Sequence, residues 1–341
     1  MAGMAIIIAC IFIAIFAYYV SPDCSPNANR MVVEIGGQKP GFTQEFIKLP
    51  KEDIVAEESF FERLINGKKD RFDYIPISGY AWRKDSVIIN KYIDEGITER
   101  IAYAVAVFPG GDKIAIEKIK FILGTDKYGR DILSRLIVGV RVSLGVGLVT
   151  VLLSVFIGVL LGAVTGYFRG RVDDIIMWFI NVVWSIPTLL LVFAITLVLG
   201  KGFWQVFIAI GLTTWVNVAR LVRGQVMAIK ELEYVEAAHA LGFGSARVIV
   251  RHILPNVMGP VIVIAASNFA TAIVIEAGLS FLGVGVQPPQ PSWGLMIKEN
   301  YNFIITHNPV LALAPGFAIM VLVLAFNMLG NGLRDALQVK E

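Results

Sequence analysis

Six apolar segments without a charged residue dominate this chain of 341 residues. They cover residues 1–20, 142–168, 175–200, 202–219, 253–275 and 308–333. A membrane-spanning helix needs about 20 mostly apolar residues, and each segment reaches or nearly reaches that length. The pattern predicts an all-α integral membrane protein with six transmembrane helices.

Charged residues are concentrated in one block between the first two apolar segments. Residues 21–137 hold 18 of the 30 Lys and Arg residues and 18 of the 27 Asp and Glu residues. Strand-like runs at Met31 to Ile35 and Ser86 to Asn90, and an amphipathic run near Ala115 to Leu123, favour a small α+β domain there. No basic block indicates nucleic-acid binding.

Basic residues in the short loops predict the orientation of the chain in the membrane. Loops 167–174 and 220–256 and the tail 334–341, which ends near Lys340, hold nine Lys and Arg residues, whereas the opposite loops hold only Lys201 and Lys298. The richer side is cytoplasmic by the positive-inside rule, so both termini are expected inside and residues 21–137 outside.

The predicted organisation therefore has four parts. They are a first transmembrane helix at 1–20, an extracytoplasmic insertion and pre-helix segment at 21–137, a five-helix core at 138–333 with a cytoplasmic hairpin at 230–256, and a tail at 334–341. Residues 1–20 are expected to be a retained span rather than a signal peptide, because the first basic residue is Arg30 and no small-residue cleavage site is clear.

The cytoplasmic hairpin is the most informative segment, because it is charged although it lies between apolar spans. Glu233 to Asn256 predicts two short helices, broken at Gly242-Phe243-Gly244 and stopped at Pro255. An ordered polar hairpin at this place suggests a docking element for another protein.

Small residues and prolines mark particular helices. Gly158, Gly162 and Gly166 lie four apart on one helix face, which allows close helix packing either within the subunit or between subunits. Pro187 and Pro315 are expected to bend the spans that contain them.

Enzymatic signatures are missing from the sequence. It has no phosphate-binding loop, and His239, His252 and His307 make no metal-ligand spacing. Glu276, at the outer end of the fifth span, is the one candidate for an ionisable group in a transport pathway, and the alternatives are that it reaches the interface or caps the next segment. The chain is therefore not expected to be an enzyme.

The hairpin resembles the cytoplasmic signature of bacterial ABC importer permeases through Glu236, Ala237, Ala238, Gly242, Leu254 and Pro255. Further blocks resemble the C-type permease subunit of the dipeptide, oligopeptide and nickel importers. These blocks are Leu123 to Asp131 with Ser134-Arg135, Gly166-Tyr167 with Gly170 and Asp173, Glu276 to Gly283 with Gln287 to Gly294, and Gly332 to Asp335. Members of that family usually begin with a basic cytoplasmic tail, which points to a truncated or misassigned start here.

The resemblance implies a type I ABC importer permease of the bacterial cytoplasmic (inner) membrane that carries di- or oligopeptides. Its implied partners are a second, B-type permease subunit, one or two ABC ATPase subunits and an extracytoplasmic solute-binding protein. The chain itself would bind no cofactor and no metal, since ATP and Mg would be used by the ATPases.

Three groups of site residues follow from the resemblance and the residue chemistry. ATPase coupling is assigned to the hairpin residues Glu236, Ala237, Ala238, Gly242, Gly244, Arg247, Leu254 and Pro255. In this group Gly242 and Gly244 permit the sharp bend between the two helices, and Ala237 and Ala238 leave a smooth face for close contact. The Glu236 carboxylate is expected to pair with a basic group on the ATPase. Asp126, Gly129, Arg130 and Asp131 form an outer-face motif, read either as a local network or as a capped amphipathic helix on the membrane surface. Glu276 and Pro187 are assigned to the pathway or its gate.

Other functions remain open at this stage. The same machinery could carry nickel, glutathione or another peptide-like solute. A membrane-anchored receptor or assembly factor would act through residues 21–122 and would not need the hairpin. Ion-coupled transport would require more ionisable residues within the spans than this sequence has.

Overall fold

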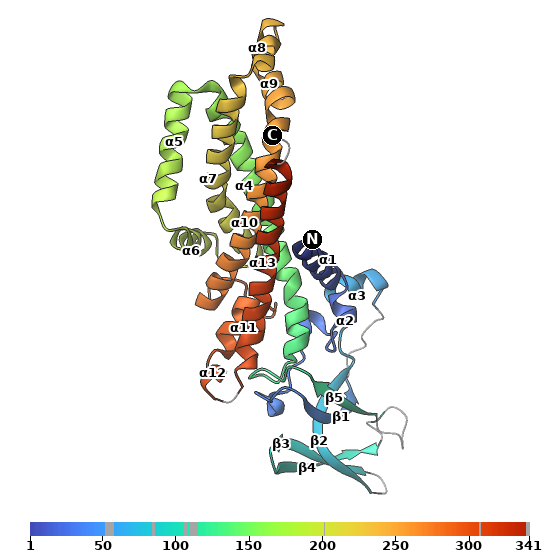
Figure 1. Ribbon diagram of the computed structural model, residues 1–341. Helices are drawn as coiled ribbons and strands as arrows, with labels where there is room; N and C mark the ends of the chain where they lie inside the picture. The colour runs from blue at the N-terminus through green and yellow to red at the C-terminus, as the bar shows by residue number, and fades with distance from the viewer. Residues whose placement is uncertain are drawn as a thin grey trace. The chain divides into compact units, whose positions relative to one another are not determined.

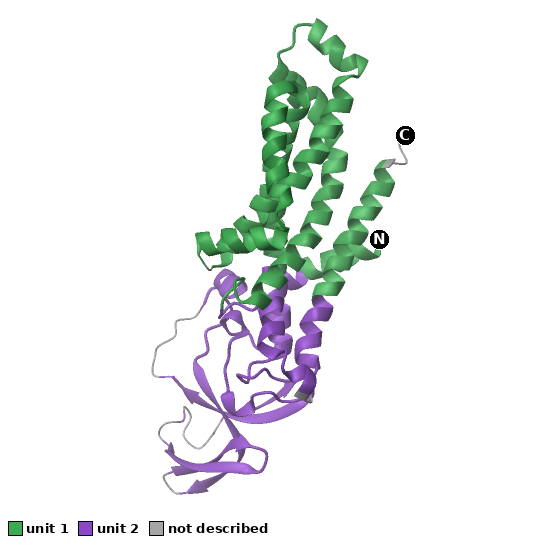
Figure 2. Cartoon of the chain, turned by 90° about the vertical axis from the view of Figure 1, so that its left-hand side faces the viewer, with its two compact units in different colours: residues 1–11, 143–287, 319–341 green, residues 12–142, 288–318 purple. Residues whose placement is uncertain are grey.

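The computed structural model describes residues 1–51, 58–83, 86–105, 108, 115–200, 202–306 and 308–338. The chain forms two compact units, each assembled from segments that are distant in sequence (Figure 2). Unit 1 contains residues 1–11, 143–287 and 319–341, and unit 2 contains residues 12–142 and 288–318. Lys201, His307 and Lys340 lie outside the described residues.

Helices make up most of the described chain (Figure 1). They are α1 (Ala2–Ile15), α2 (Ala17–Val20), α3 (Phe60–Asn66), α4 (Ile132–Phe168), α5 (Gly170–Ser185), α6 (Thr188–Leu199), α7 (Phe203–Lys230), α8 (Glu233–Ala240), α9 (Ser245–Val248), α10 (Leu254–Leu282), α11 (Trp293–Asn300), α12 (Phe303–Thr306) and α13 (Val310–Gln338). A π-helical turn, Ile249–Ile253, joins α9 to α10.

Four helical runs in the described residues are long and apolar enough to cross a membrane. They are α4, α7, the continuous run Ser245–Leu282 and α13, and the bent pair α5–α6 makes a fifth if it counts as one span. Residues 1–20 do not form one long helix, because α1 ends at Ile15 after 14 residues and α2 follows Phe16.

The bend predicted at Pro187 is confirmed and is sharper than a kink. The axes of α5 and α6 differ by 95°. Proline disfavours the helical conformation in the residue before it, and Ile186 is extended with φ −91° and ψ 129°. By contrast, α13 continues through Pro315 as a single helix.

In unit 1 the glycine stripe of α4 packs against α7 of the same chain. A Cβ atom built on Gly158 would lie 2.5 Å from the Cβ of Val218, and one on Gly162 would lie 2.6 Å from the carbonyl oxygen of Ala219. Gly166 meets the carbonyl oxygen of Arg223 in the same way, at 2.7 Å. The stripe therefore serves helix packing within the subunit, the first of its two predicted alternatives.

Unit 2 contains a five-stranded antiparallel sheet with the order β4-β3-β2-β1-β5. The strands are β1 (Phe42–Pro50), β2 (Phe72–Arg83), β3 (Ser86–Asp94), β4 (Ile97–Ala104) and β5 (Ile116–Phe121). Alternate residues supply two apolar clusters, since Phe46 packs with Phe121 and its neighbour Ile47 packs with Ile77 and Ile89. With the short helix α3, this arrangement matches the α+β domain expected from the sequence.

The strand predictions in this region were right in one case and wrong in another. Ser86 to Asn90 lies in β3, and the amphipathic run near Ala115 to Leu123 supplies β5. The prediction at Met31 to Ile35 is wrong, because Val33–Ile35 forms a 3₁₀ turn. Ile35 is buried there, and its carbonyl oxygen accepts a hydrogen bond from the Thr125 hydroxyl at 2.5 Å, which replaces a strand partner.

The α4–α7 contact predicts a contrast between two glycines. Gly162→Ala should destabilise the protein by about 1 to 3 kcal/mol, because the new methyl group overlaps the α7 backbone. Gly224→Ala is the matched control, since Gly224 lies in α7 with nothing within 4 Å of its Cβ position, and the change there should be neutral or slightly stabilising. Thermal unfolding of the detergent-solubilised protein measures both, and equal melting temperatures would contradict the close packing.

Candidate functional site

The hairpin predicted between the spans is present between the end of α7 and the start of α10 (Figure 1). Helix α8 ends at Ala240 and α9 begins at Ser245, so the break falls at the predicted glycines. Gly242 has a φ of +81°, a conformation that residues with a side chain rarely adopt. Its N–H donates to the carbonyl oxygen of His239 at 2.9 Å, which closes the end of α8.

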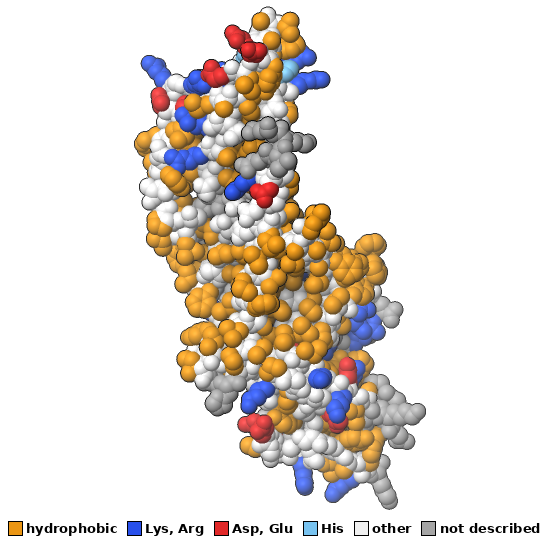
Figure 3. All heavy atoms as spheres, viewed as in Figure 1, with side chains coloured by type: hydrophobic (Ala, Val, Ile, Leu, Met, Phe, Trp, Pro, Cys, Tyr) orange, Lys and Arg blue, Asp and Glu red, His pale blue; other side chains and the backbone are white. Residues whose placement is uncertain are grey.

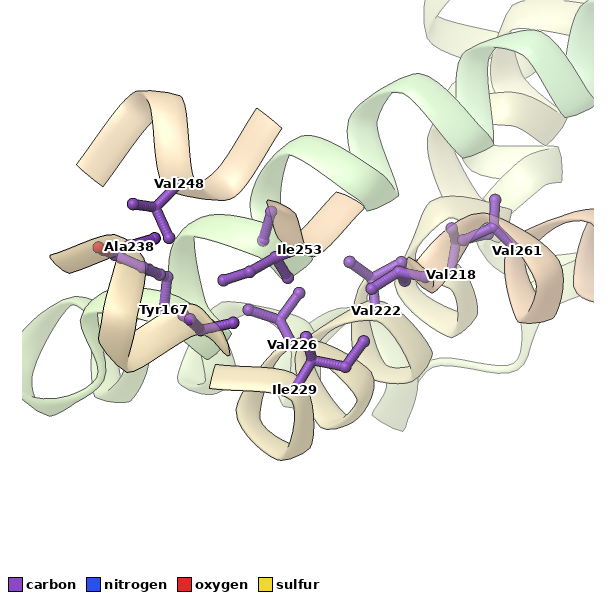
Figure 4. Packing of buried hydrophobic residues seen from close by; sticks show 12 residues of the cluster. Tyr167, Val218, Val222, Val226, Ile229, Ala238, Val248, Ile253 and Val261 are labelled. Carbon is purple, nitrogen blue, oxygen red and sulfur yellow. The ribbon is translucent and has the colours of Figure 1, made fainter. Parts of the chain in front are cut away.

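The hairpin is built on the same apolar core as the long helices (Figure 4). Val235 and Ala238 of α8, Val248 of α9 and Ile253 of the π turn are buried against residues of α4, α7 and α10. Those residues are Ala163, Tyr167, Val218, Val222, Val226, Ile229, Val257 and Val261. A rigid connection follows, because moving α8 requires moving side chains packed on α7.

Ala238 does not offer the smooth outer face that the sequence suggested. Only 4% of its surface is exposed, because it points into this core, whereas Ala237 and Glu236 are exposed. The correction follows from helical geometry, since Val235 and Ala238 are three apart and share the inward face of α8.

Polar contacts fasten the hairpin to the neighbouring helix ends. The hydroxyl of Tyr167, at the end of α4, lies 3.0 Å from Nε2 of His239. Lys230 Nζ donates to the carbonyl oxygen of Tyr167 at 2.8 Å, which satisfies a terminal helix carbonyl. Tyr167 thus connects the end of α4 to both the end of α7 and the hairpin.

The outward face of the hairpin combines apolar and charged side chains. Leu241 and Val250 are 74% and 65% exposed, beside the exposed Glu236 and Arg247. The sequence analysis missed both apolar residues. Val250 could have been recognised, because it falls out of phase with the inward residues of its helical run, but Leu241 lies in a turn and gave no periodic signal.

Pro255 does not end the hairpin, contrary to the prediction. The chain stays helical from Ser245 to Leu282, with Pro255 in the first turn of α10. The missing N–H of proline costs little there, because the preceding π turn already alters the hydrogen-bond pattern. Leu254 beside it is half-buried against the hairpin core.

A cavity of about 310 Å³ lies beside the α5–α6 break in unit 1. Its polar lining comes from Thr188 of α6, from Thr213, Thr214 and Asn217 of α7, and from Thr271 of α10. Pro187 forms the turn at this cavity, between the lining residues Ile186 and Thr188. Asn217 is exposed, and its amide needs a polar environment.

Glu276 does not line that cavity. It is 1% exposed within α10, where its Oε1 accepts a hydrogen bond from the Ser280 hydroxyl at 2.6 Å. The same hydroxyl oxygen accepts from the N–H of Val286 at 3.0 Å. Glu276 is therefore linked through Ser280 to the turn after α10, and its assignment to the pathway or its gate stays a prediction.

The outer-face motif in unit 2 forms a buried network of charges. Asp126 accepts hydrogen bonds from the N–H groups of Tyr128 and Arg130 at 2.9 and 3.0 Å, and its other oxygen lies 2.6 Å from Arg130 Nε. Arg130 Nη2 donates to Glu299 at 2.7 Å, across 169 residues of sequence. Only 1% of the Arg130 side chain is exposed, so this network supports the first of the two predicted interpretations.

Gly129 and Asp131 complete the motif through backbone geometry and capping. Gly129 has a φ of +74°, and a Cβ on it would lie 1.7 Å from the carbonyl oxygen of Val32. The Asp131 carboxylate accepts the N–H of Ser134 at 2.8 Å just before α4 begins. Burial raises the pKa of Asp131, while the hydrogen bonds from Ser134 oppose that shift. Asn29, Arg135 and Glu299 also belong to this network. Arg135 had entered only through the family resemblance, and Glu299 was missed because no local pattern relates α11 to residues 126–135.

Comparison with known proteins identifies relatives of one kind. The family described as binding-protein-dependent transport system inner membrane component matches residues 158–340. The glutathione transport system permease protein GsiD of Pectobacterium atrosepticum is 41% identical over 218 residues, which cover 64% of this chain and 72% of that protein. The oligopeptide transport system permease protein OppC of Bacillus subtilis and the dipeptide transport system permease protein DppC of Alkalihalophilus pseudofirmus are each 42% identical over 217 residues, 64% of this chain and 71% of theirs.

Solved structures of ABC transporters also match this chain. A chain of the inward-facing MetNI methionine ABC transporter aligns with a TM-score of 0.50 and 19% sequence identity, over 60% of this chain and 97% of its own length. At this identity the likeness concerns the fold alone, and it confirms the helical architecture expected from the sequence.

The charge network makes a prediction about stability. Arg130→Met should destabilise unit 2 by about 3 to 5 kcal/mol, because the Asp126 and Glu299 carboxylates lose their close partner and keep only Arg135, whose nitrogens lie 3.9 and 3.7 Å from them. Arg100→Met on the exposed strand β4 is the control and should change stability by less than about 0.5 kcal/mol. Melting temperatures of the purified protein test this, and an unchanged value for Arg130→Met would refute the network's structural role.

Proposed function

The chain belongs to the family of binding-protein-dependent transport system inner membrane components and has the fold of a type I ABC importer permease. We propose that it moves di- or oligopeptides across the cytoplasmic membrane by coupling to separate ATPase subunits. The observation that carries the proposal is the hairpin of α8 and α9. It is rigidly built on the core of the long helices and presents exposed Leu241, Val250, Glu236 and Arg247.

Coupling requires that the contact between the hairpin and the ATPase differs between the conformational states of the ATPase. Exposed apolar side chains flanked by charges are typical of a surface that docks another protein, with the apolar groups giving affinity and the charges giving register. Because Val235 and Ala238 are packed against α7, a displacement of the docked hairpin is transmitted to the membrane helices.

The cavity at the α5–α6 break is our candidate for this chain's part of the pathway. Threonine hydroxyls and the Asn217 amide can exchange hydrogen bonds with the backbone of a peptide. The break at Pro187 supplies backbone that is not held in a regular helix, which is tolerated at membrane depth where it is buried in protein or lines a water-filled cavity.

The remaining parts of the machine follow from this assignment. We propose six spans, with α1 and α2 acting as the first and the α5–α6 pair as the third, and with both termini in the cytoplasm. The sheet of unit 2 would then lie outside as an insertion between the first two spans. The partners would be a second permease, one or two ATPases that use ATP and Mg, and a solute-binding protein, while this chain would hold no cofactor.

The cargo has one specific alternative, because the relatives include permeases named for glutathione transport as well as for dipeptides and oligopeptides. Glutathione is itself peptide-like, so the same hydroxyl and amide lining suits it. A charge-based site for a bare metal cation finds no support in the cavity, whose lining contains no carboxylate, cysteine or histidine.

Purification and uptake test the proposal together. The tagged chain, solubilised gently from its native membrane, should bring down a second permease of similar size and one or two nucleotide-binding ATPases. The complex in proteoliposomes, with its binding protein outside and ATP inside, should take up labelled dipeptide. Unlabelled peptides should compete, and Ni²⁺ should not.

The outcomes of this experiment separate machinery from cargo. Recovery of the chain without any ATPase, even after mild crosslinking, would contradict coupling and favour a receptor or assembly factor. ATP-driven uptake that is inhibited by glutathione rather than by dipeptides would support the ATP-driven importer and would identify glutathione, not dipeptides, as its cargo.

The turn of the hairpin predicts a second contrast. Gly242→Val should lower ATP-driven uptake by about tenfold or more, because a β-branched side chain is strained by roughly 1 to 2 kcal/mol at a φ of +81° and distorts the turn. Gly244→Val is the control, since Gly244 has a φ of −65° and a ψ of 151° and open space around it. Equal uptake by both variants at equal protein level would show that the shape of the turn is unimportant.

A further inference from the structure

Helix α3 in unit 2 carries an exposed apolar surface that no part of the described chain covers. Phe60, Phe61 and Ile65 are 57%, 70% and 61% exposed, and we call these three side chains the α3 patch. Phe61 and Ile65 are four apart and therefore lie on one helix face. Three large apolar side chains grouped on a seven-residue helix are unusual for a surface that faces water.

The helix that carries the patch is held firmly. The ring of Phe60 lies 5.4 Å from the ring of Tyr19, whose hydroxyl donates to the Phe60 carbonyl oxygen at 3.4 Å. At the other end of α3, the N–H of Lys68 donates to the carbonyl oxygen of Cys24 at 2.7 Å. The patch is thus a preformed surface, fixed next to α2.

This surface continues an apolar stripe on the preceding helical segment. Phe12 and Ile15 of α1 are exposed and three residues apart, which places them on one side of that helix, and Tyr19 of the following helix α2 is exposed as well. In a membrane protein, an exposed stripe of this kind on an apolar helix faces lipid. The ring contact between Tyr19 and Phe60 joins the stripe to the α3 patch.

Cationic groups surround the aromatic residues at this junction. The Arg63 guanidinium lies 4.6 Å from the centre of the Tyr19 ring, and that of Arg141 lies 5.1 Å from the centre of the Tyr18 ring. Arg141 also donates to the carbonyl oxygen of Ile65 at 3.0 Å. Lys68 and Lys69 are exposed just after the helix. Figure 3 shows hydrophobic side chains gathered over the region of α3, with Lys and Arg side chains beside them.

We propose that the α3 patch inserts into the headgroup region of the lipid bilayer and anchors the sheet domain to the membrane surface. Tyrosine and phenylalanine rings with neighbouring lysine and arginine are the residues enriched where a helix leaves the hydrocarbon region. A short helix with apolar residues on one face and cations at its rim lies in that interface and contacts lipid phosphates. The occupant is the bilayer itself, because the patch extends a lipid-facing stripe.

Spin-label accessibility in the assembled transporter tests this assignment. Cys10 and Cys24, which are free, are first replaced by serine, and Phe61→Cys is then labelled with a nitroxide. Ile65→Cys serves as a second position on the patch, and Glu99→Cys on the exposed strand β4 serves as the control. Collision rates with oxygen, which concentrates in lipid, and with a water-soluble nickel chelate give the depth of each label in proteoliposomes.

Labels at positions 61 and 65 should favour oxygen over the chelate and report a depth of about 5 to 10 Å, whereas the label at 99 should favour the chelate. Chelate access at 61 and 65 equal to that at 99 would overturn the proposal. Protection from both reagents would also overturn it, since a protein partner would then cover the patch. Uptake measured on the same preparations shows whether the variants are assembled, and it separates a failed anchor from a failed transporter assignment.

Discussion

The close approach of α4 to α7 is the contact on which the helical packing of unit 1 depends. Three glycines let the two backbones meet, and the side chains they admit are Val218, Val222 and Val226. The same valines belong to the core that holds α8, α9 and the start of α10. A single apolar seam therefore runs from the middle of a membrane helix into a hairpin whose outer face carries both apolar and charged side chains. Without it, the hairpin would be a flexible loop with no mechanical connection to the spans.

Much of this arrangement could be predicted from the sequence, because its physical causes are local. Uncharged segments identified the long helices, the Gly-Phe-Gly stretch identified the break in the hairpin, and Pro187 identified the turn between α5 and α6. Each signal lies within a few residues of its effect. The inward position of Ala238 also followed a helical period, although the family resemblance had assigned it to the outer face.

The failures have non-local causes. Pro255 was expected to stop a helix, but the π turn before it removes the conflict, and that turn depends on how the hairpin packs. Val33–Ile35 was expected to be extended, but it bonds to Thr125 and packs under the sheet instead. Glu299 entered no prediction, although it is the acid that completes the Arg130 network, because its partner lies 169 residues earlier. The hydrogen bond from Ser280 to Glu276, and the one from Val286 to Ser280, likewise depend on the turn after α10.

The π-helical turn at Ile249–Ile253 lets α9 and α10 present different faces, whereas a regular α-helix would fix the two faces relative to each other. One extra residue in a helix turns everything before it by about 100° relative to everything after it. The face that α9 presents to a docking protein is therefore set independently of the face that α10 presents to α7. Gaining or losing one residue at this point would rotate the exposed face of the hairpin by that angle and leave the packing of α10 against α7 unchanged.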